Sequence, residues 1–158
     1  MGCDIHGYIE TRRYSLKSET KWRLRNKFTL CPYWELGDCI ETKFDCIKSF
    51  SDRNYLAFYM LAGVRDNGSF KVEPFSEPRG IPLNVNSYIS SEVSEWGYDA
   101  HSHSYITLME LREYRSNYQK VINESISLNL KELEDEMSVY LNGELKEDNI
   151  RFVFWFDN

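Results

Sequence analysis

The 158-residue sequence has few of the residues that interrupt regular structure, with only 8 glycines and 4 prolines. It also has no apolar run near the roughly 20 residues that a membrane-spanning helix needs. The composition is 42% hydrophobic and 15% aromatic, which excludes disordered, collagenous and low-complexity chains. We therefore expect a single folded domain over residues 1–158 that has no membrane partner.

Basic residues are also fewer than acidic ones. The sequence has 19 Lys and Arg and 25 Asp and Glu, which gives a formal net charge of −6. Proteins that bind nucleic acid polymers need basic groups against phosphates, so the composition argues against such a partner. Basic residues do gather early in the chain, at Arg12, Arg13, Lys17, Lys21, Arg23, Arg25 and Lys27. This segment is either a solvated hairpin face or a rim that attracts anions.

Signals for export and for cysteine chemistry are missing as well. Residues 1–4 have neither a basic nor an apolar leader, which predicts a cytoplasmic protein. The four cysteines show no C-x-x-C spacing, so we expect reduced thiols in place of disulfides or a structural zinc site. They are Cys3, Cys31, Cys39 and Cys46.

Alternating apolar and polar residues predict strands at both ends of the chain. Residues 3–13 alternate with period two, and a turn at 17–20 leads to a second predicted strand at 22–30. Residues 149–156 are apolar on both faces, which is typical of a central strand, and we expect this strand to lie beside the first one.

Capping signals predict helices between these strands. Ser51 or Asp52 can cap a helix that ends at Gly63, and Thr107 with Glu110 fits a capping box. Further helices are predicted at 88–96 and 130–141. The order of elements predicts an α+β domain with a mixed or antiparallel sheet and two or three helices.

The three histidines are the main candidates for chemistry. His6 follows Asp4 by two residues, so on a strand both side chains lie on the face opposite Ile5. In an extended segment His101 and His103 would likewise share a side. Imidazole and carboxylate groups together can ligate a divalent metal or move protons near neutral pH.

Four interpretations of these residues stay open. The first is a divalent metal site, whose ligands would be Asp4, His6, His101 and His103. The second is metal-free acid–base catalysis on a phosphoester by His6 with His101 or His103. The third is a binding pocket in which the histidines donate hydrogen bonds or stack on a base, and the fourth is a purely structural role.

Two arginines are candidate anion ligands. Arg65 follows the predicted helix end at Gly63, and Arg79 lies between Pro78 and Pro82, which stiffen the segment that presents it. Arginine binds phosphate through two parallel hydrogen bonds. The alternative is that each arginine pairs with a carboxylate of the same segment, namely Asp66, Glu73 or Glu77.

Five short segments form a recognisable pattern. They read MGCDIH at 1–6, RNY at 53–55, LAGVR at 61–65, PRGIP at 78–82 and DAHSHS at 99–104. This pattern resembles that of a family of small, largely uncharacterised proteins of bacteriophages and bacteria. A phage origin would place the protein in the host cytoplasm. By analogy with other small viral proteins, such an origin would also suggest a role in countering host defence by capturing or destroying a nucleotide-derived signal.

The leading hypothesis is a pocket that sequesters a small, phosphate-bearing, nucleotide-like ligand. Its lining would be Asp4, His6, Arg65, Arg79, His101 and His103. The first alternative is a phosphodiesterase or metal-dependent hydrolase with His6, His101 and His103 as catalytic residues. The second is a protein–protein inhibitor without a pocket, and whether the chain forms a homo-oligomer stays open. The leading hypothesis requires the first strand to meet the histidine-bearing segment around one hollow.

Overall fold

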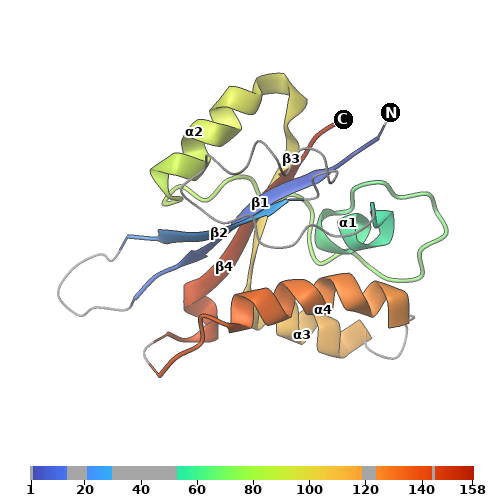
Figure 1. Cartoon of the computed structure of the whole chain (residues 1–158). Coiled ribbons are helices and arrows are strands. Elements are labelled where there is room, and N and C mark those ends of the chain that lie inside the picture. Colours follow the sequence, from blue (N-terminus) through green and yellow to red (C-terminus); the bar gives the residue numbers. More distant parts are fainter. Residues whose placement is uncertain (1, 14–20, 30–52, 119–123, 144) are drawn as a thin grey trace.

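The computed structural model describes residues 2–13, 21–29, 53–118, 124–143 and 145–158 (Figure 1). Its elements are β1 (Ile5–Thr11), β2 (Arg23–Thr29), α1 (Tyr55–Ala62), α2 (Ser87–Trp96), β3 (His101–Thr107), α3 (Leu108–Tyr118), α4 (Glu124–Ser138) and β4 (Ile150–Phe156). Short 3-10 helices, η2 (Gly97–Asp99) and η3 (Glu147–Asn149), precede β3 and β4. The α+β class is confirmed, and the described residues form four α-helices in place of two or three. The predictions for Cys31, Cys39 and Cys46 lie outside the described residues.

The four strands form one antiparallel sheet in the order β2-β1-β4-β3 (Figure 1). β1 and β4 pair along their full length, from Ile5 opposite Phe156 to Thr11 opposite Ile150. All residues of these two strands are buried, because helices cover both faces of the sheet. The expectation that the closing strand is central and lies beside the first strand is confirmed.

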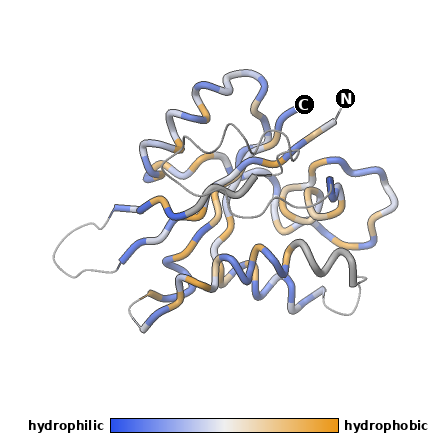
Figure 2. The backbone as a smooth tube through the Cα atoms, viewed as in Figure 1, coloured by the Kyte–Doolittle hydropathy of each residue, from blue (hydrophilic) through white to orange (hydrophobic). Residues whose placement is uncertain are grey.

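Three helices, α1, α3 and α4, cover one face of the sheet. The strands contribute Ile5, Ile9, Ile106, Phe152, Phe154 and Phe156 to this core. The helices contribute Phe58, Met60, Leu61, Leu111, Leu133 and Met137. Figure 2 shows this apolar character most clearly on α1. No helix in the described part of the chain is both long enough and apolar enough to cross a membrane.

Helix α2 covers the opposite face, where its buried Ile89 packs on Tyr8 and Trp155. A buried ion pair lies on the same face, with Arg151 Nε 2.7 Å from Glu10 Oε2. The other carboxylate oxygen of Glu10 accepts the backbone N–H of Asn86 at 2.6 Å. Because Asn86 is the N-cap of α2, this contact fixes the start of the helix on the sheet.

Side chains cap the helices much as the sequence predicts. Thr107 and Glu110 form the expected capping box, since each side chain accepts a backbone N–H of the other residue. Helix α1 is capped by Asn54 and not, as the sequence predicts, by Ser51 or Asp52, which lie outside the described residues; the Asn54 side chain accepts the N–H of Ala57 at 3.1 Å. It ends at Gly63, which has a φ of +68° and so adopts the left-handed conformation that favours glycine.

Candidate functional site

A β-bulge interrupts β3 at the histidine motif. His101 pairs with Phe156 and Ser104 with Phe154, so two residues, Ser102 and His103, lie opposite Trp155. Ser102 has a φ of +51°, a left-handed conformation that side chains other than glycine rarely adopt. The expectation that His101 and His103 share a side is therefore wrong, because the extra residue shifts the alternation of the strand.

His6 lies on the α2 face of the sheet, opposite Trp155 on β4. The residue is only 7% exposed, and its ring centroid lies 4.4 Å from that of Trp96. Its Nε2 atom is 2.9 Å from Oδ2 of Asp157. His101 lies instead on the opposite face, where its ring stacks on Phe156. The two histidines do not share a hollow, because β4 separates them.

Asp4 is held by an arginine and by the last residues of the chain. Its carboxylate accepts two hydrogen bonds from Arg53, at 2.6 and 2.9 Å. Its backbone N–H donates to Oδ1 of Asp157 at 2.9 Å, and its carbonyl accepts the N–H of Asp157 at 3.1 Å. Asp4 therefore belongs to a structural network and does not line the Arg65–His101 hollow described next.

Arg65 and His101 line a hollow of about 370 Å³ between the end of α1 and the start of β3. Its other lining residues are Ala62, Gly63, Val64, Glu77, Pro78, Ser102 and Asn158. Arg65 has a φ of +63°, so both non-glycine residues with a positive φ in the described chain, Arg65 and Ser102, line this one hollow. Strained backbone of this kind clusters at functional sites.

His101, which lines the hollow, has one ring nitrogen without a hydrogen-bond partner. His101 Nδ1 lies 2.9 Å from Ser102 Oγ, whereas Nε2 is buried and has no partner among the described residues. His103 Nε2 is also buried without a partner. Burial, and to a smaller extent the charge of His101, lowers the pKa of His103 below its ordinary 6.5.

Arg79 does not reach this hollow, so the prediction that it helps to bind the ligand is corrected. Its guanidinium forms an ion pair with Glu110 at 3.0 Å and also donates to the carbonyl of Tyr105. Burial raises the pKa of Glu110, but hydrogen bonds from Arg79 and Thr107 outweigh it and hold that pKa below its ordinary value. Arg79 thus forms the arginine–carboxylate pair of the alternative interpretation, with Glu110 as its partner in place of Asp66, Glu73 or Glu77.

The metal prediction for Asp4, His6, His101 and His103 is also corrected. The described parts of the chain contain no group of three or more His, Cys, Asp or Glu residues that could hold a metal ion. Asp4 is paired with Arg53, His6 with Asp157, and the bulge turns His101 and His103 apart. The four side chains therefore have no common centre.

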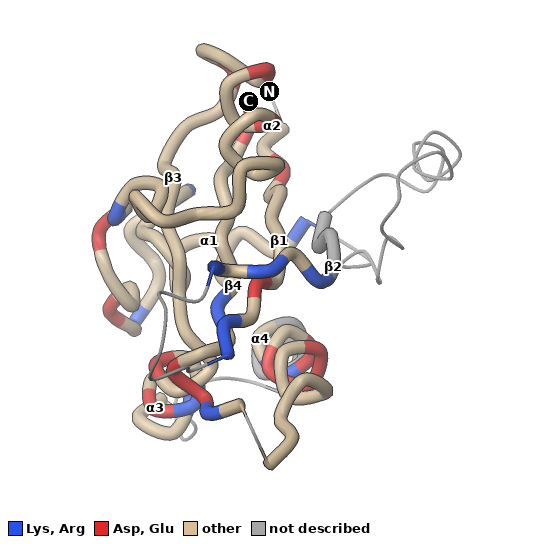
Figure 3. The backbone as a smooth tube through the Cα atoms, turned by 90° about the vertical axis from the view of Figure 1, so that its left-hand side faces the viewer, with Lys and Arg blue, Asp and Glu red and all other residues tan. Residues whose placement is uncertain are grey.

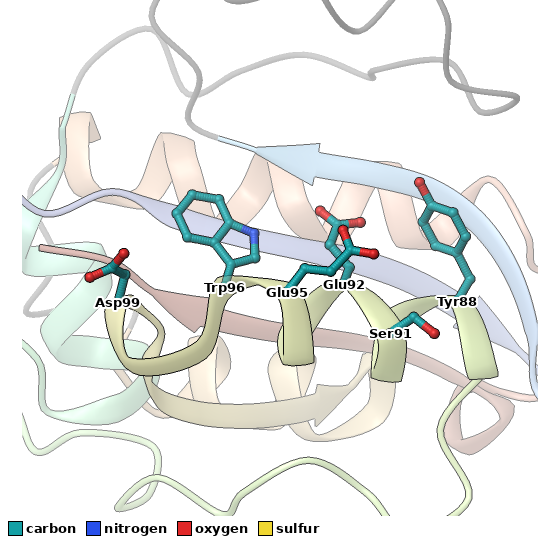
Figure 4. A pocket seen from close by; sticks show the side chains of 6 residues that line it. All are labelled: Tyr88, Ser91, Glu92, Glu95, Trp96 and Asp99. Carbon is teal, nitrogen blue, oxygen red and sulfur yellow. The ribbon is translucent and has the colours of Figure 1, made fainter.

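Sequence reasoning missed an acidic hollow of about 520 Å³ on α2, which is lined by Tyr88, Ser91, Glu92, Glu95, Trp96 and Asp99 (Figure 4). These residues recur at intervals of three and four, a spacing that places them on one helix face and could have revealed the group. Burial, followed by the charge of Glu95, raises the pKa of Glu92 from 4.5 to about 7. Three carboxylates and no cation make this hollow unsuitable for a phosphate.

No protein-family model, curated protein or solved structure matches the chain.

Proposed function

We propose that the protein binds a small, phosphate-bearing, nucleotide-like ligand in the hollow of Arg65 and His101. The observation that carries this proposal is that Arg65, His101 and Ser102 line one hollow, that Arg65 and Ser102 have a positive φ, and that one ring nitrogen of His101 has no partner among the described residues. The proposal keeps two of the residues that the sequence singled out. It leaves out Asp4, His6 and Arg79, which form ion pairs with other residues, and His103, which does not line the hollow.

Arg65 supplies the positive charge for the phosphate. Its guanidinium donates to two neutral oxygens, the carbonyl of Gly2 at 3.2 Å and the side-chain amide of Asn158 at 3.4 Å. These contacts help to position the exposed guanidinium at the hollow. Glu77 also lines the hollow, but it is exposed at the surface, where water and salt screen its charge.

His101 supplies a contact that becomes complete only when a ligand is bound. A buried polar atom without a hydrogen bond costs free energy, and a phosphate oxygen that accepts from Nε2 would remove that cost. The hydroxyl of Ser102 is 2.9 Å from the other ring nitrogen and so helps to orient the ring. The positive φ of Ser102 fixes this arrangement at the bulge.

The size of the hollow supports a small ligand. A volume of about 370 Å³ lies at the lower end of the roughly 300–1,000 Å³ that is typical of ligand sites. The resemblance to phage proteins suggests the biological context, which is sequestration of a nucleotide-derived defence signal in the host cytoplasm. In this role the protein acts through its affinity, without turnover of the ligand.

The test is to titrate the full chain with nucleoside mono- and diphosphates and to measure affinity by calorimetry. We expect Arg65→Gln to weaken binding about tenfold or more, the loss of one charge-assisted contact. Lys71→Gln, which removes one exposed charge away from the hollow, serves as the matched control and should leave the affinity unchanged. Equal affinity of the wild type and Arg65→Gln, or no binding of any nucleotide, would overturn the proposal.

A second measurement separates binding from catalysis. The protein is incubated with the bound nucleotide, heat-denatured, and the supernatant is examined by mass spectrometry. Intact nucleotide supports sequestration. Cleaved nucleotide would show that the hydrolase alternative is correct. Loss of this cleavage in His101→Gln would then place the reaction at the Arg65–His101 hollow.

A further inference from the structure

A second hollow lies at the opposite end of the sheet. Its volume is about 540 Å³, and it is lined by Arg12, Lys21, Trp22, Asn84, Val85, Asn86 and Ser87. It sits beyond Thr11, the last residue of β1, whereas the Arg65–His101 hollow lies near Ile5, the first. Seven residues of strand separate the two ends, so the hollows are roughly 20 Å apart. They are therefore distinct sites.

The second hollow is positively charged. None of its lining residues is acidic, and neither Arg12 nor Lys21 forms an ion pair with another residue that the structure describes. The buried carboxylate of Glu10 lies beneath this region, but Arg151 and the N–H of Asn86 already occupy its oxygens. Figure 3 shows Lys and Arg gathered where β1, β2 and β4 meet. Two cations that have no ion-pair partner among the described residues therefore line the hollow.

Hydrogen-bond donors line the same hollow. Trp22 is only 6% exposed, and its indole Nε1 has no hydrogen-bond partner among the residues that the structure describes. Ser87 is the first residue of α2, a helix of ten residues, so the positive end of the helix dipole is located here. The cations, the indole N–H and the helix start all favour a negatively charged acceptor.

The ring of Trp22 limits the kind of ligand. The guanidinium carbons of Arg151 and Arg12 lie 3.8 and 4.8 Å from its ring centroid. Because two guanidinium groups already pack against the indole, it is not a free platform on which a nucleobase could stack. The hollow therefore fits a compact anion better than a planar aromatic group.

We propose that this hollow binds a phosphate or diphosphate group. Arg12 and Lys21 provide the charge, and the indole N–H of Trp22 and the hydroxyl of Ser87 provide directed donors. This site gives a function to the basic segment at Arg12 and Lys21, one of the two interpretations that the sequence left open. It does not depend on the ligand of the Arg65–His101 hollow.

The test uses the indole N–H of Trp22 as a local reporter. The ¹⁵N-labelled full chain is titrated with inorganic pyrophosphate, and the assigned Trp22 signal is followed among those of the four tryptophans. We expect this signal to shift and saturate. The double variant Arg12→Gln/Lys21→Gln should weaken the binding about tenfold or more, because two charge-assisted contacts are lost. Arg65→Gln should leave this titration unchanged.

The matched control is Lys71→Gln/Lys131→Gln, which removes the same net charge from exposed positions outside the hollow. An equal loss of affinity in both double variants, or a Trp22 signal that does not shift at millimolar pyrophosphate, would overturn the proposal. So would a Trp22 titration that is lost in Arg65→Gln. A parallel titration with a nucleoside diphosphate shows whether the bound group comes from a free anion or from a nucleotide. Equal affinities for pyrophosphate and the nucleoside diphosphate support recognition of the diphosphate group alone.

Discussion

His6 Nε2 lies 2.9 Å from Oδ2 of Asp157, and this contact ties the start of β1 to the residue that follows β4. The other carboxylate oxygen of Asp157 accepts the backbone N–H of Asp4 at 2.9 Å. Together these bonds extend the β1–β4 pairing beyond Ile5 and Phe156. His6, which the sequence suggests as a catalytic residue, therefore links the two central strands through Asp157.

The first prediction concerns acid stability through Asp157. Burial raises the pKa of Asp157, but the hydrogen bonds from His6 and Asp4 and the nearby charges of His6 and Arg53 outweigh it. Its pKa in the folded protein is therefore below 3.8, so its stabilising contribution is present above that value and is lost as the pH falls further. Urea unfolding below about pH 4 should show this loss.

The matched variant for this prediction is Asp157→Asn, which keeps the shape of the side chain and cannot ionise. It should be less stable than the wild type near neutral pH, and the difference should shrink as the acid range is entered. If the difference in unfolding free energy is independent of pH from neutral to strongly acid solution, Asp157 does not stabilise the fold through its charge.

The second prediction concerns the buried pair of Glu10 and Arg151. The side chains are 0% and 5% exposed, and Nε and Oε2 are 2.7 Å apart. Removing one partner leaves an uncompensated buried charge, so Glu10→Gln should cost about 3–5 kcal/mol of unfolding free energy. Chemical denaturation at neutral pH measures this cost.

An exposed pair provides the comparison. Lys131 and Asp135 lie one turn apart on α4, and their side chains are 52% and 60% exposed. Lys131→Ala should cost no more than about 0.5 kcal/mol, because solvent screens such pairs. Similar losses for Glu10→Gln and Lys131→Ala would contradict the assignment of Glu10 as a buried structural charge.

The third prediction concerns the close approach of two strands at Gly7. A Cβ atom at this position would lie 2.5 Å from the ring of Phe152 and 2.7 Å from the carbonyl oxygen of Val153. Since the carbonyl belongs to the backbone of β4, relief requires the strands to move apart. Gly7→Ala should therefore destabilise the protein by about 1–3 kcal/mol.

Gly143 is the matched control for Gly7, because nothing lies within 4 Å of the Cβ that alanine would add there. Thermal unfolding of the two variants gives the comparison. A melting temperature for Gly7→Ala that equals that of Gly143→Ala would show that the central strands are not in close contact at this point.

Local patterns were sufficient to predict most of the fold. Alternation located β1 and β4, and the capping box of Thr107 and Glu110 located the start of α3. Tertiary partners could not be predicted in this way. Asp157 is 151 residues from His6, and Glu110 is 31 residues from Arg79, and no local pattern distinguishes these carboxylates from the others.

The bulge at Ser102 shows a second limit of local patterns. A positive φ at a serine opposes the backbone preference of that residue, so its cause lies in the surrounding structure. The bulge decides that His101 faces the hollow with Arg65 while His103 does not. The residue types of the candidate site could therefore be predicted from the sequence, but which of those residues line one hollow could not.

The last prediction concerns the pH dependence that Glu92 introduces. Burial and the charge of Glu95 raise the pKa of Glu92 from 4.5 to about 7 in the folded protein. Between these two values the folded state holds more protons than the unfolded state, so Glu92 makes stability fall as the pH rises from 4.5 to about 7. His103 acts in the opposite direction, because its lowered pKa makes stability rise with pH below 6.5.

Comparing the wild type with Glu92→Gln isolates the contribution of Glu92, since His103 is the same in both proteins. Glutamine can still accept the hydrogen bond from the hydroxyl of Tyr8. We expect Glu92→Gln to gain melting temperature relative to the wild type between about pH 5 and about pH 8. Glu113→Gln, at an exposed position on α3, should show no such trend. If the difference in melting temperature between the wild type and Glu92→Gln is constant across this range, Glu92 titrates as an ordinary surface carboxylate.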